Sequence, residues 1–456
     1  MDEDGLPLPR RYIAIVAVVL AIVMAVLDGA IANVALPTIA RDVHADPATS
    51  IWVVNAYQLA IVICLLPFAS LGEILGYRRV FCGGLIVFTL ASGACALSHN
   101  LAQLVSARVV QGVGAAAIMS LTAALIRNTY PQRMLGRAIG YNALSVSIAA
   151  AVGPTIASAI LSAADWPWLF AVNLPIGVLA LLASMALPAT RGSRGTFDAL
   201  AALLNALAFG LLIIGVDAIA HIGAIGAIAI IAGLAFAVLL VRRERNAAAP
   251  LVPVDLLRIP AISIAVMAST AIFAAQMLAF VTLPFFLQRD FHRDQVATGF
   301  LMTPWPVAVG LMAPIAGRLS DRLPAAVLCG AGGAIFTLGL VFLAVLPPDA
   351  SGLEICAAMV VCGLGFGFYQ APNNRELIGS APKARSGAAG GLQATARLLG
   401  QTIGASAVAL IFRQSDHTGF RFALSSAAIL AAIAAAISAF RPARPAPKLE
   451  EPTQGQ

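Results

Sequence analysis

Long apolar stretches recur along the whole chain, and their length limits the possible folds more than any other feature of the sequence. A helix needs about 20 apolar residues to cross roughly 30 Å of hydrocarbon. Such stretches can be placed fourteen times, at residues 12–36, 50–72, 79–98, 101–127, 137–163, 167–188, 198–218, 220–241, 260–287, 295–317, 323–345, 352–374, 386–412 and 419–440. The sequence therefore predicts an all-α integral membrane protein with fourteen spans.

Composition and charge exclude several other classes of protein. Hydrophobic residues make up 60% of the chain and charged residues only 11%, with a mean hydropathy of +0.91, which excludes a water-soluble domain. The six cysteines lie in or beside apolar stretches without CxxC spacing, so we expect neither a zinc site nor a disulfide framework. The net charge is +7, but the basic residues are scattered between apolar stretches, as in membrane loops, which excludes a nucleic-acid partner.

The distribution of basic residues between successive loops predicts the orientation of the chain. Cytoplasmic loops of membrane proteins collect lysine and arginine. If both termini are cytoplasmic, 21 of the 28 lysines and arginines fall on that side and five on the other, and the remaining two, Arg108 and Arg397, lie within spans. This bias requires an even number of spans. Twelve spans would satisfy it as well if residues 198–241 formed a folded loop, so the count of fourteen depends on the length of the apolar runs there.

Two similar segments indicate an internal repeat. Residues 69–76 and 317–324 each close an even-numbered span, and each has a leucine two residues before an acid, Glu73 or Asp321. Paired repeats allow many transporters to alternate access between the two sides of a membrane. The sequence predicts four parts: a six-helix bundle at 1–190, two additional helices with linkers at 191–257, a second six-helix bundle at 258–440 and a disordered cytoplasmic tail at 441–456.

Five motifs follow one another in the N-terminal part of the chain. They are LDGAIANVALP at 27–37, ASLGEILGYRR at 69–79, LVSARVVQGVGA at 104–115, GP at 153–154, and WPWLF with NLPIG between 166 and 177. In their order and positions they resemble the major facilitator superfamily, specifically its fourteen-span drug:proton antiporters of the EmrB/QacA type.

The resemblance implies a function and a set of partners. We expect a proton-coupled antiporter in the cell (inner) membrane that exports small lipophilic or cationic compounds by alternating access. The alternative is a proton-coupled carrier for a metabolite such as a sugar, an amino acid or a siderophore, because one fold serves many substrates. Small-molecule substrates, protons and the lipid bilayer are the expected partners, together with a periplasmic adaptor protein.

Enzyme signatures are missing from the sequence. It contains no GxxxxGK[ST], HExxH or GxSxG motif. We therefore expect no enzymatic activity, no metal and no cofactor, with the proton gradient as the energy source.

Charged residues inside apolar stretches are the main site candidates, because burying a charge in a bilayer costs about 2.5–3.5 kcal/mol. Asp28 lies eight residues before Leu36, and Arg108 lies seven residues after Leu101. At 1.5 Å per residue both lie about 11–12 Å below the outer face, with Gln111 one helical turn from Arg108. Two interpretations stay open: Asp28 binds the transported proton, or the two charges form a fixed structural pair.

Two further residues complete the predicted proton-coupling and substrate set. Tyr57 is an aromatic residue in the second span, where a ring face could hold a flat or cationic molecule. Arg397 lies on one helical face with Gln393 and Gln401, and this polar stripe must line a cavity or a helix interface. A single embedded acid beside aromatic rings favours neutral or monovalent cationic substrates.

Residues near helix ends and a proline-containing span are the predicted gating elements. Glu73 can pair with basic groups such as Arg78 and Arg79 in one state of the transporter and release them in the other. Gly153 and Pro154 interrupt the fifth span, where the resemblance implies that they limit proton leak, although a simple kink is an equally good interpretation. The predicted gating set is Glu73, Gly76, Arg78, Arg79, Gly153, Pro154 and Asp321.

Overall fold

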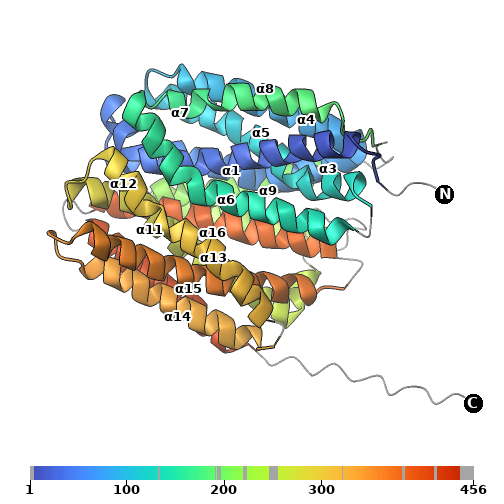
Figure 1. Ribbon diagram of the computed structural model, residues 1–456. Helices are drawn as coiled ribbons and strands as arrows, with labels where there is room; N and C mark the ends of the chain where they lie inside the picture. Colours follow the sequence, from blue (N-terminus) through green and yellow to red (C-terminus); the bar gives the residue numbers. More distant parts are fainter. Residues whose placement is uncertain are drawn as a thin grey trace, which may run out of the picture.

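In the computed structural model, every regular element among the described residues is a helix, as the sequence predicted. The described residues are 5–131, 134–190, 192, 197–218, 223–245, 255–320, 322–382, 386–414 and 419–441. Asp321 and residues 442–456 of the predicted tail lie outside them. The helices run roughly side by side, with the beginning of α1 at one end of the molecule and α12 at the opposite end (Figure 1).

The helices of the N-terminal part form one group. They are α1 (Arg10–Asp42), α2 (Pro47–Ser50), α3 (Trp52–Leu75), α4 (Tyr77–Ala96), α5 (Leu101–Thr129), α6 (Leu135–Ala163), α7 (Trp168–Ala171) and α8 (Asn173–Ser184). Within this group α5 packs against α3 and α4, while α1 packs against α6 and α8.

The helices of the C-terminal part form a second group. They are the short 3-10 helix η2 (Leu256–Arg258), α11 (Pro260–Arg289), α12 (Gln295–Met302), α13 (Pro304–Leu319), α14 (Ala325–Val345), α15 (Gly352–Gly379), α16 (Ser386–Gln414) and α17 (Gly419–Ala439). Here α15 packs against α13 and α14, and α11 packs against α16 and α17.

Two helices stand between these groups in the sequence, α9 (Ala199–Ala218) and α10 (Gly223–Glu244). They pack mainly against each other, and α9 also contacts α3 and α16. At the N-cap of α9, Asp198 accepts from the Ala201 N–H, and this bond together with Arg243 holds the pKa of the Asp198 carboxyl below its ordinary value. The described residues of the segment 198–241 therefore form a pair of helices.

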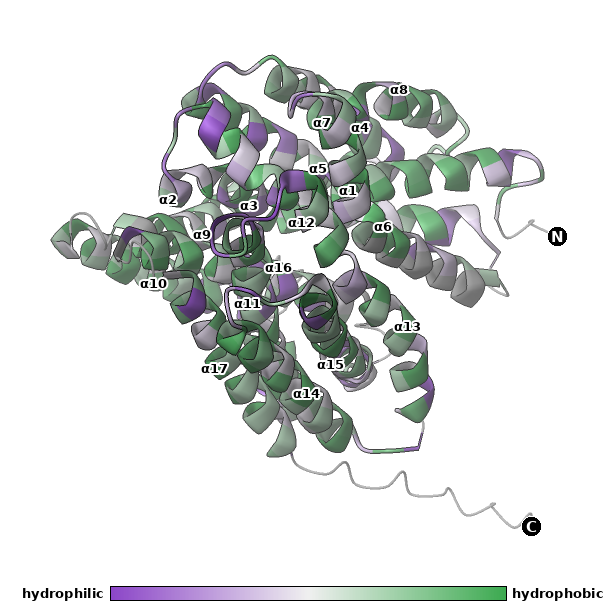
Figure 2. Ribbon diagram, turned by 60° about the vertical axis from the view of Figure 1, so that its left-hand side comes forward, coloured by the Kyte–Doolittle hydropathy of each residue, from purple (hydrophilic) through white to green (hydrophobic). Residues whose placement is uncertain are grey.

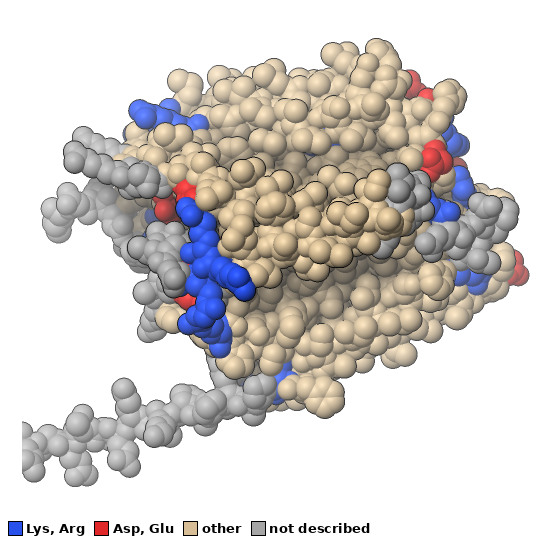
Figure 3. Space-filling view, turned by 180° about the vertical axis from the view of Figure 1, so that it is seen from behind, with Lys and Arg blue, Asp and Glu red and all other residues tan. Residues whose placement is uncertain are grey.

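The surface of the molecule is suited to lipid. Within the described residues, twelve helical segments are long and apolar enough to cross a membrane, and α9 and α10 are among them. Figure 2 shows that hydrophobic residues make up most of the length of the helices, and large apolar side chains such as Ile228, Ile231 and Leu182 are exposed. On the face shown in Figure 3, charged residues gather toward the two ends and leave an uncharged band between them. Such a band is the surface that a bilayer covers.

Candidate functional site

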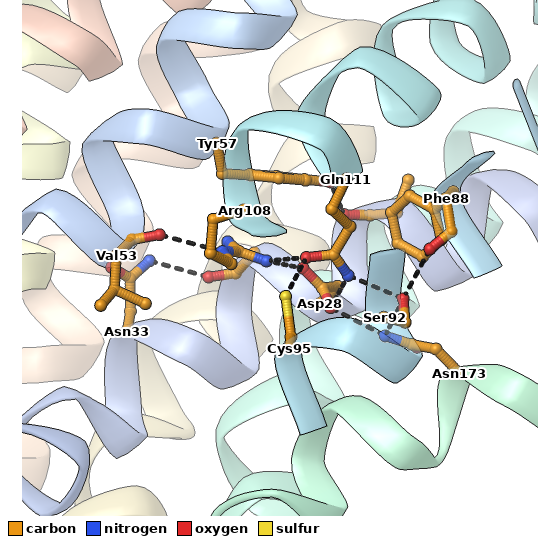
Figure 4. A network of polar contacts seen from close by, with 12 residues as sticks. Asp28, Asn33, Val53, Tyr57, Phe88, Ser92, Cys95, Arg108, Gln111 and Asn173 are labelled. Atoms are coloured by element: carbon orange, nitrogen blue, oxygen red, sulfur yellow. Dashed lines mark hydrogen bonds and ion pairs between the residues drawn. The ribbon is translucent and has the colours of Figure 1, made fainter. Parts of the chain in front are cut away.

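A buried ion pair joins α1 to α5 in the middle of the N-terminal group (Figure 4). The Arg108 guanidinium donates to the Asp28 carboxylate, and the two side chains are 0% and 1% exposed. The amides of Gln111 and Asn173 donate to the other carboxylate oxygen of Asp28, at 2.8 and 2.7 Å. The carboxylate thus has one charged and two neutral donors, which compensates its removal from water.

The Arg108 side chain is fixed by further contacts. Its Nε donates to the Val53 carbonyl at 2.9 Å, and its Nη1 donates to the Gln111 Oε1 at 2.6 Å. The Tyr57 ring lies 4.0 Å from the guanidinium carbon and the Phe170 ring 5.5 Å, so the cation also lies over two aromatic faces.

The network extends to residues that had no role in the sequence prediction. The Gln111 amide donates to the Ser92 hydroxyl on α4 at 2.8 Å, and Asn173 brings in α8. The signal for Asn173 was present in the NLPIG motif, but a motif does not show which way a side chain points. The network therefore ties α1, α3, α4, α5 and α8 together, and the prediction that Asp28 and Arg108 lie at one depth agrees with it.

A central cavity of about 240 Å³ lies between the two helix groups. Both groups line it: α1, α3, α5 and α6 on one side, and α11, α13, α15 and α16 on the other. Tyr57 belongs to this lining and also covers Arg108, while its hydroxyl donates to the Ala25 carbonyl at 3.0 Å. Tyr57 thus lies between the ion pair and the cavity, so a movement of Arg108 would also move a residue of the cavity lining.

The charge that lines the cavity comes from Arg397. Asp28, Arg108 and Gln111 are not part of the lining, whereas Arg397 and Gln401 are. The polar stripe of α16 does not line the cavity as a whole. Its third member, Gln393, instead donates to Asn374 within its own helix group. The expectation of cationic substrates relied on an acid facing the cavity, and the structure instead turns Asp28 toward Arg108.

Hydrogen bonds between the two helix groups gather toward the end opposite the beginning of α1. Gln295 accepts from the Thr38 hydroxyl at 2.8 Å and donates to the Leu161 carbonyl at 3.1 Å. Two further side-chain bonds cross between the groups in this half of the molecule, Thr155 with Thr303 at 2.8 Å and Asn55 with Ser406 at 3.4 Å. We call these four bonds the clamp. They join the two helix groups in this half of the molecule.

The predicted gate after α3 lies at the other end. Gly76 has φ +95°, and a Cβ there would lie 2.6 Å from the Thr190 carbonyl oxygen, so only glycine fits. The adjacent Tyr77 N–H donates to the Thr190 hydroxyl at 2.9 Å. Glu73 is exposed and, within the described residues, forms no ion pair. Its pairing with Arg78 or Arg79 in another state stays a prediction.

At Gly153, α6 approaches α1 closely. A Cβ at Gly153 would lie 2.6 Å from the Ala30 Cβ, so the G153A substitution should push these helices apart and destabilise the protein by about 1–3 kcal/mol. Thermal melting of the purified protein checks this. Gly83→Ala is the control, because no atom lies near its added methyl. The double variant Gly153→Ala/Ala30→Gly should recover the loss; no recovery would contradict the packing explanation. Pro154 lies inside α6, and its predicted role in gating stays a prediction.

Comparison with known proteins finds relatives over nearly the whole chain. The family model described as Major Facilitator Superfamily matches residues 18–405. The chain is 51% identical over 454 residues to "Uncharacterized transporter YebQ" of Escherichia coli (strain K12), with 98% of each chain covered. It is 30% identical to the riboflavin transporter RibZ of Clostridioides difficile (strain 630), with 89% of each covered. It is also 30% identical to the multidrug resistance protein Stp of Mycobacterium tuberculosis (strain ATCC 25618 / H37Rv), with 86% of this chain and 74% of Stp covered.

Solved structures share the arrangement of helices. A POT family transporter in complex with a thioalcohol-conjugated peptide matches with a TM-score of 0.72 at 13% identity, covering 94% of this chain and 95% of that one. A bacterial homologue of the human lysosomal transporter Spinster, in an inward-facing and unoccupied conformation, matches with a TM-score of 0.69 at 15% identity, covering 95% and 97%. At these identities the likeness concerns the fold alone.

Proposed function

The chain belongs to the Major Facilitator Superfamily, and from this premise we propose that it is a proton-coupled antiporter that exports small, largely apolar compounds by alternating access. Membership makes it a multi-pass transporter of the cell membrane that acts on small molecules and is not an enzyme, as the sequence predicted. The proposal depends above all on one observation: the ion pair of Asp28 with Arg108 is buried, and the Tyr57 ring that lies over Arg108 also lines the central cavity.

Protonation of Asp28 supplies the coupling step. A proton on the carboxylate removes the charge that holds Arg108, so the guanidinium and the Tyr57 ring over it can move, and the cavity changes shape. Loss of the proton on the other side restores the pair. A tenfold proton gradient supplies about 1.4 kcal/mol per proton, and 100 mV adds about 2.3 kcal/mol per charge moved. These energies are large enough to bias two nearly balanced conformations.

We further propose fourteen spans with cytoplasmic termini, as in the EmrB/QacA-type antiporters. Twelve segments qualify by length and composition, and α6, with 29 residues, and the pair α7–α8 add two more passes. Efflux relatives such as Stp support export, whereas RibZ supports the alternative of a metabolite carrier. No bound cofactor is proposed, and the periplasmic adaptor stays a prediction.

Transport in proteoliposomes tests the function. The purified protein is reconstituted, a pH gradient is imposed, and the movement of ethidium and of riboflavin is followed together with the proton flux reported by an internal dye. Antiport predicts that substrate and protons move in opposite directions and that a protonophore stops accumulation. Movement of both in the same direction would support the metabolite carrier, and movement independent of protons would contradict both.

Gln295 is the centre of the clamp, since it bonds to two segments of the N-terminal group. Replacing it with leucine removes two hydrogen bonds of roughly 0.5–1.5 kcal/mol each and should shift the population several-fold toward a form open at that end. The measurement is labelling of a cysteine introduced at Gly29, in a variant without native cysteines, by an impermeant maleimide added to whole cells. Gln103→Leu is the control, because Gln103 is exposed and bonds only within its own helix end. Equal labelling of both variants would contradict the role of the clamp.

A further inference from the structure

We infer that the central cavity recognises organic anions: planar aromatic compounds that carry a carboxylate or a comparable negatively charged group, bound through Arg397. This inference deepens the proposed function, on which it rests, by naming the class of substrate. It begins from the charge of the cavity. Among the described residues that line it, Arg397 is the charged one, and no aspartate or glutamate accompanies it.

Within the part of the chain that the structure describes, Arg397 has no hydrogen-bonding or ionic partner. Its Nε is buried without a hydrogen bond, and no ion pair or hydrogen bond of its guanidinium is found within the described part of the chain. Arg108 shows the contrast, because its charge is matched by the buried carboxylate of Asp28. An unpaired cation inside a membrane protein is costly to keep, and such residues commonly face a substrate path. A negatively charged ligand would supply the missing partner through charge-assisted hydrogen bonds.

The remaining lining fits a flat molecule with additional polar groups. Aromatic rings of Phe273, Phe280 and Trp305 line the cavity and offer surfaces for a planar ligand. The amides of Asn33 and Gln276 also line it, and each has a buried oxygen without a hydrogen-bond partner. The volume of about 240 Å³ suits a compact molecule of one or two fused rings. Ring faces attract cations too, but a full positive charge nearby repels a cation more strongly.

A second cavity beside the clamp carries charge of the same sign. It lies at the end of α1 against α11 and α12, and its lining includes Arg41, Arg289 and Arg293, with Asp294 as its one acidic residue among those described. Gln295 of the clamp belongs to the same lining. When the clamp opens, a ligand leaving the central cavity in that direction would meet a positively charged vestibule, which favours an anion along its whole route.

Three probes of the same shape and different charge test the inference. Binding of 2-naphthoate, 2-naphthamide and 2-naphthylmethylammonium to the full chain in nanodiscs is measured by equilibrium dialysis without any gradient. We expect 2-naphthoate to bind at least about tenfold more tightly than the other two. Arg397→Gln should bring the affinity for 2-naphthoate down to that of the amide, and Arg397→Lys should retain part of the preference. The control Arg242→Gln, which replaces an exposed arginine outside the cavity lining, should change nothing.

The outcomes separate the substrate class from the proposed antiport. Tighter binding of the ammonium probe, a preference for naphthoate that survives in the Arg397→Gln variant, or no binding of any probe would overturn the inference. Melting of each variant is recorded beside its binding, and a folded Arg397→Gln protein that still prefers naphthoate counts against it. Because these measurements use no proton gradient, a failure of proton-coupled export in proteoliposomes leaves them unaffected, and the two proposals can fail independently.

Discussion

Replacing Asp28 with asparagine is expected to abolish proton-coupled efflux while leaving the protein folded in the membrane. The change removes the carboxylate of the buried network, the group proposed to carry the proton, yet the asparagine oxygen can still accept from Gln111 and Asn173. Without this carboxylate the proton gradient can no longer drive substrate transport, so the accumulation ratio of the substrate across the membrane should fall to about one. The measurement is substrate accumulation by energised vesicles, with and without a protonophore.

Controls distinguish coupling from a purely structural role of Asp28. Substrate counterflow, which needs alternating access but no net proton movement, should persist in the Asp28→Asn variant. Asp349→Asn, which removes an exposed acid, should transport as the unaltered protein does. Accumulation that is unchanged and still sensitive to protonophore would rule out Asp28 as the proton site. Loss of counterflow together with a lower melting temperature would instead favour the fixed structural pair.

The depth of the embedded charges could be calculated from the sequence, but their partners could not. Helical rise alone places Asp28 and Arg108 at one level. Which faces of α1 and α5 meet depends on the rotation of each helix, and a nearly uniformly apolar helix carries little periodic signal for it. The contributions of Asn173 and Ser92 depend on that rotation, so they became visible only in the structure.

The division of the α16 stripe shows the same limit at another place. Spacing put Gln393, Arg397 and Gln401 on one face and required that this face avoid lipid. It did not show that Gln393 bonds within its own helix group while the other two line the cavity. The clamp could not be predicted from the sequence either, since Thr38 and Gln295 lie 257 positions apart and neither belongs to a recognisable motif.

Arg108→Met is expected to produce the largest loss of stability among single substitutions in the network, about 3–5 kcal/mol. The change removes the charge that compensates Asp28 and leaves a buried carboxylate with only two neutral donors. It also removes the bond to the Val53 carbonyl, which links α5 to α3. The measurement is unfolding of the purified protein in mixed micelles with increasing denaturant.

A double-variant cycle shows whether this loss comes from the unpaired charge. The Asp28→Asn/Arg108→Met protein has no uncompensated carboxylate, so it should be more stable than Arg108→Met alone, with a coupling energy of more than about 1 kcal/mol between the two positions. The exposed pair of Asp198 with Arg243, whose side chains are 39% and 43% accessible, provides the matched comparison, and its coupling should stay below about 1 kcal/mol. Strictly additive losses at Asp28 and Arg108 would show that the pair does not stabilise the fold through its charges, and the proton-coupling role would then have to rely on the transport data alone.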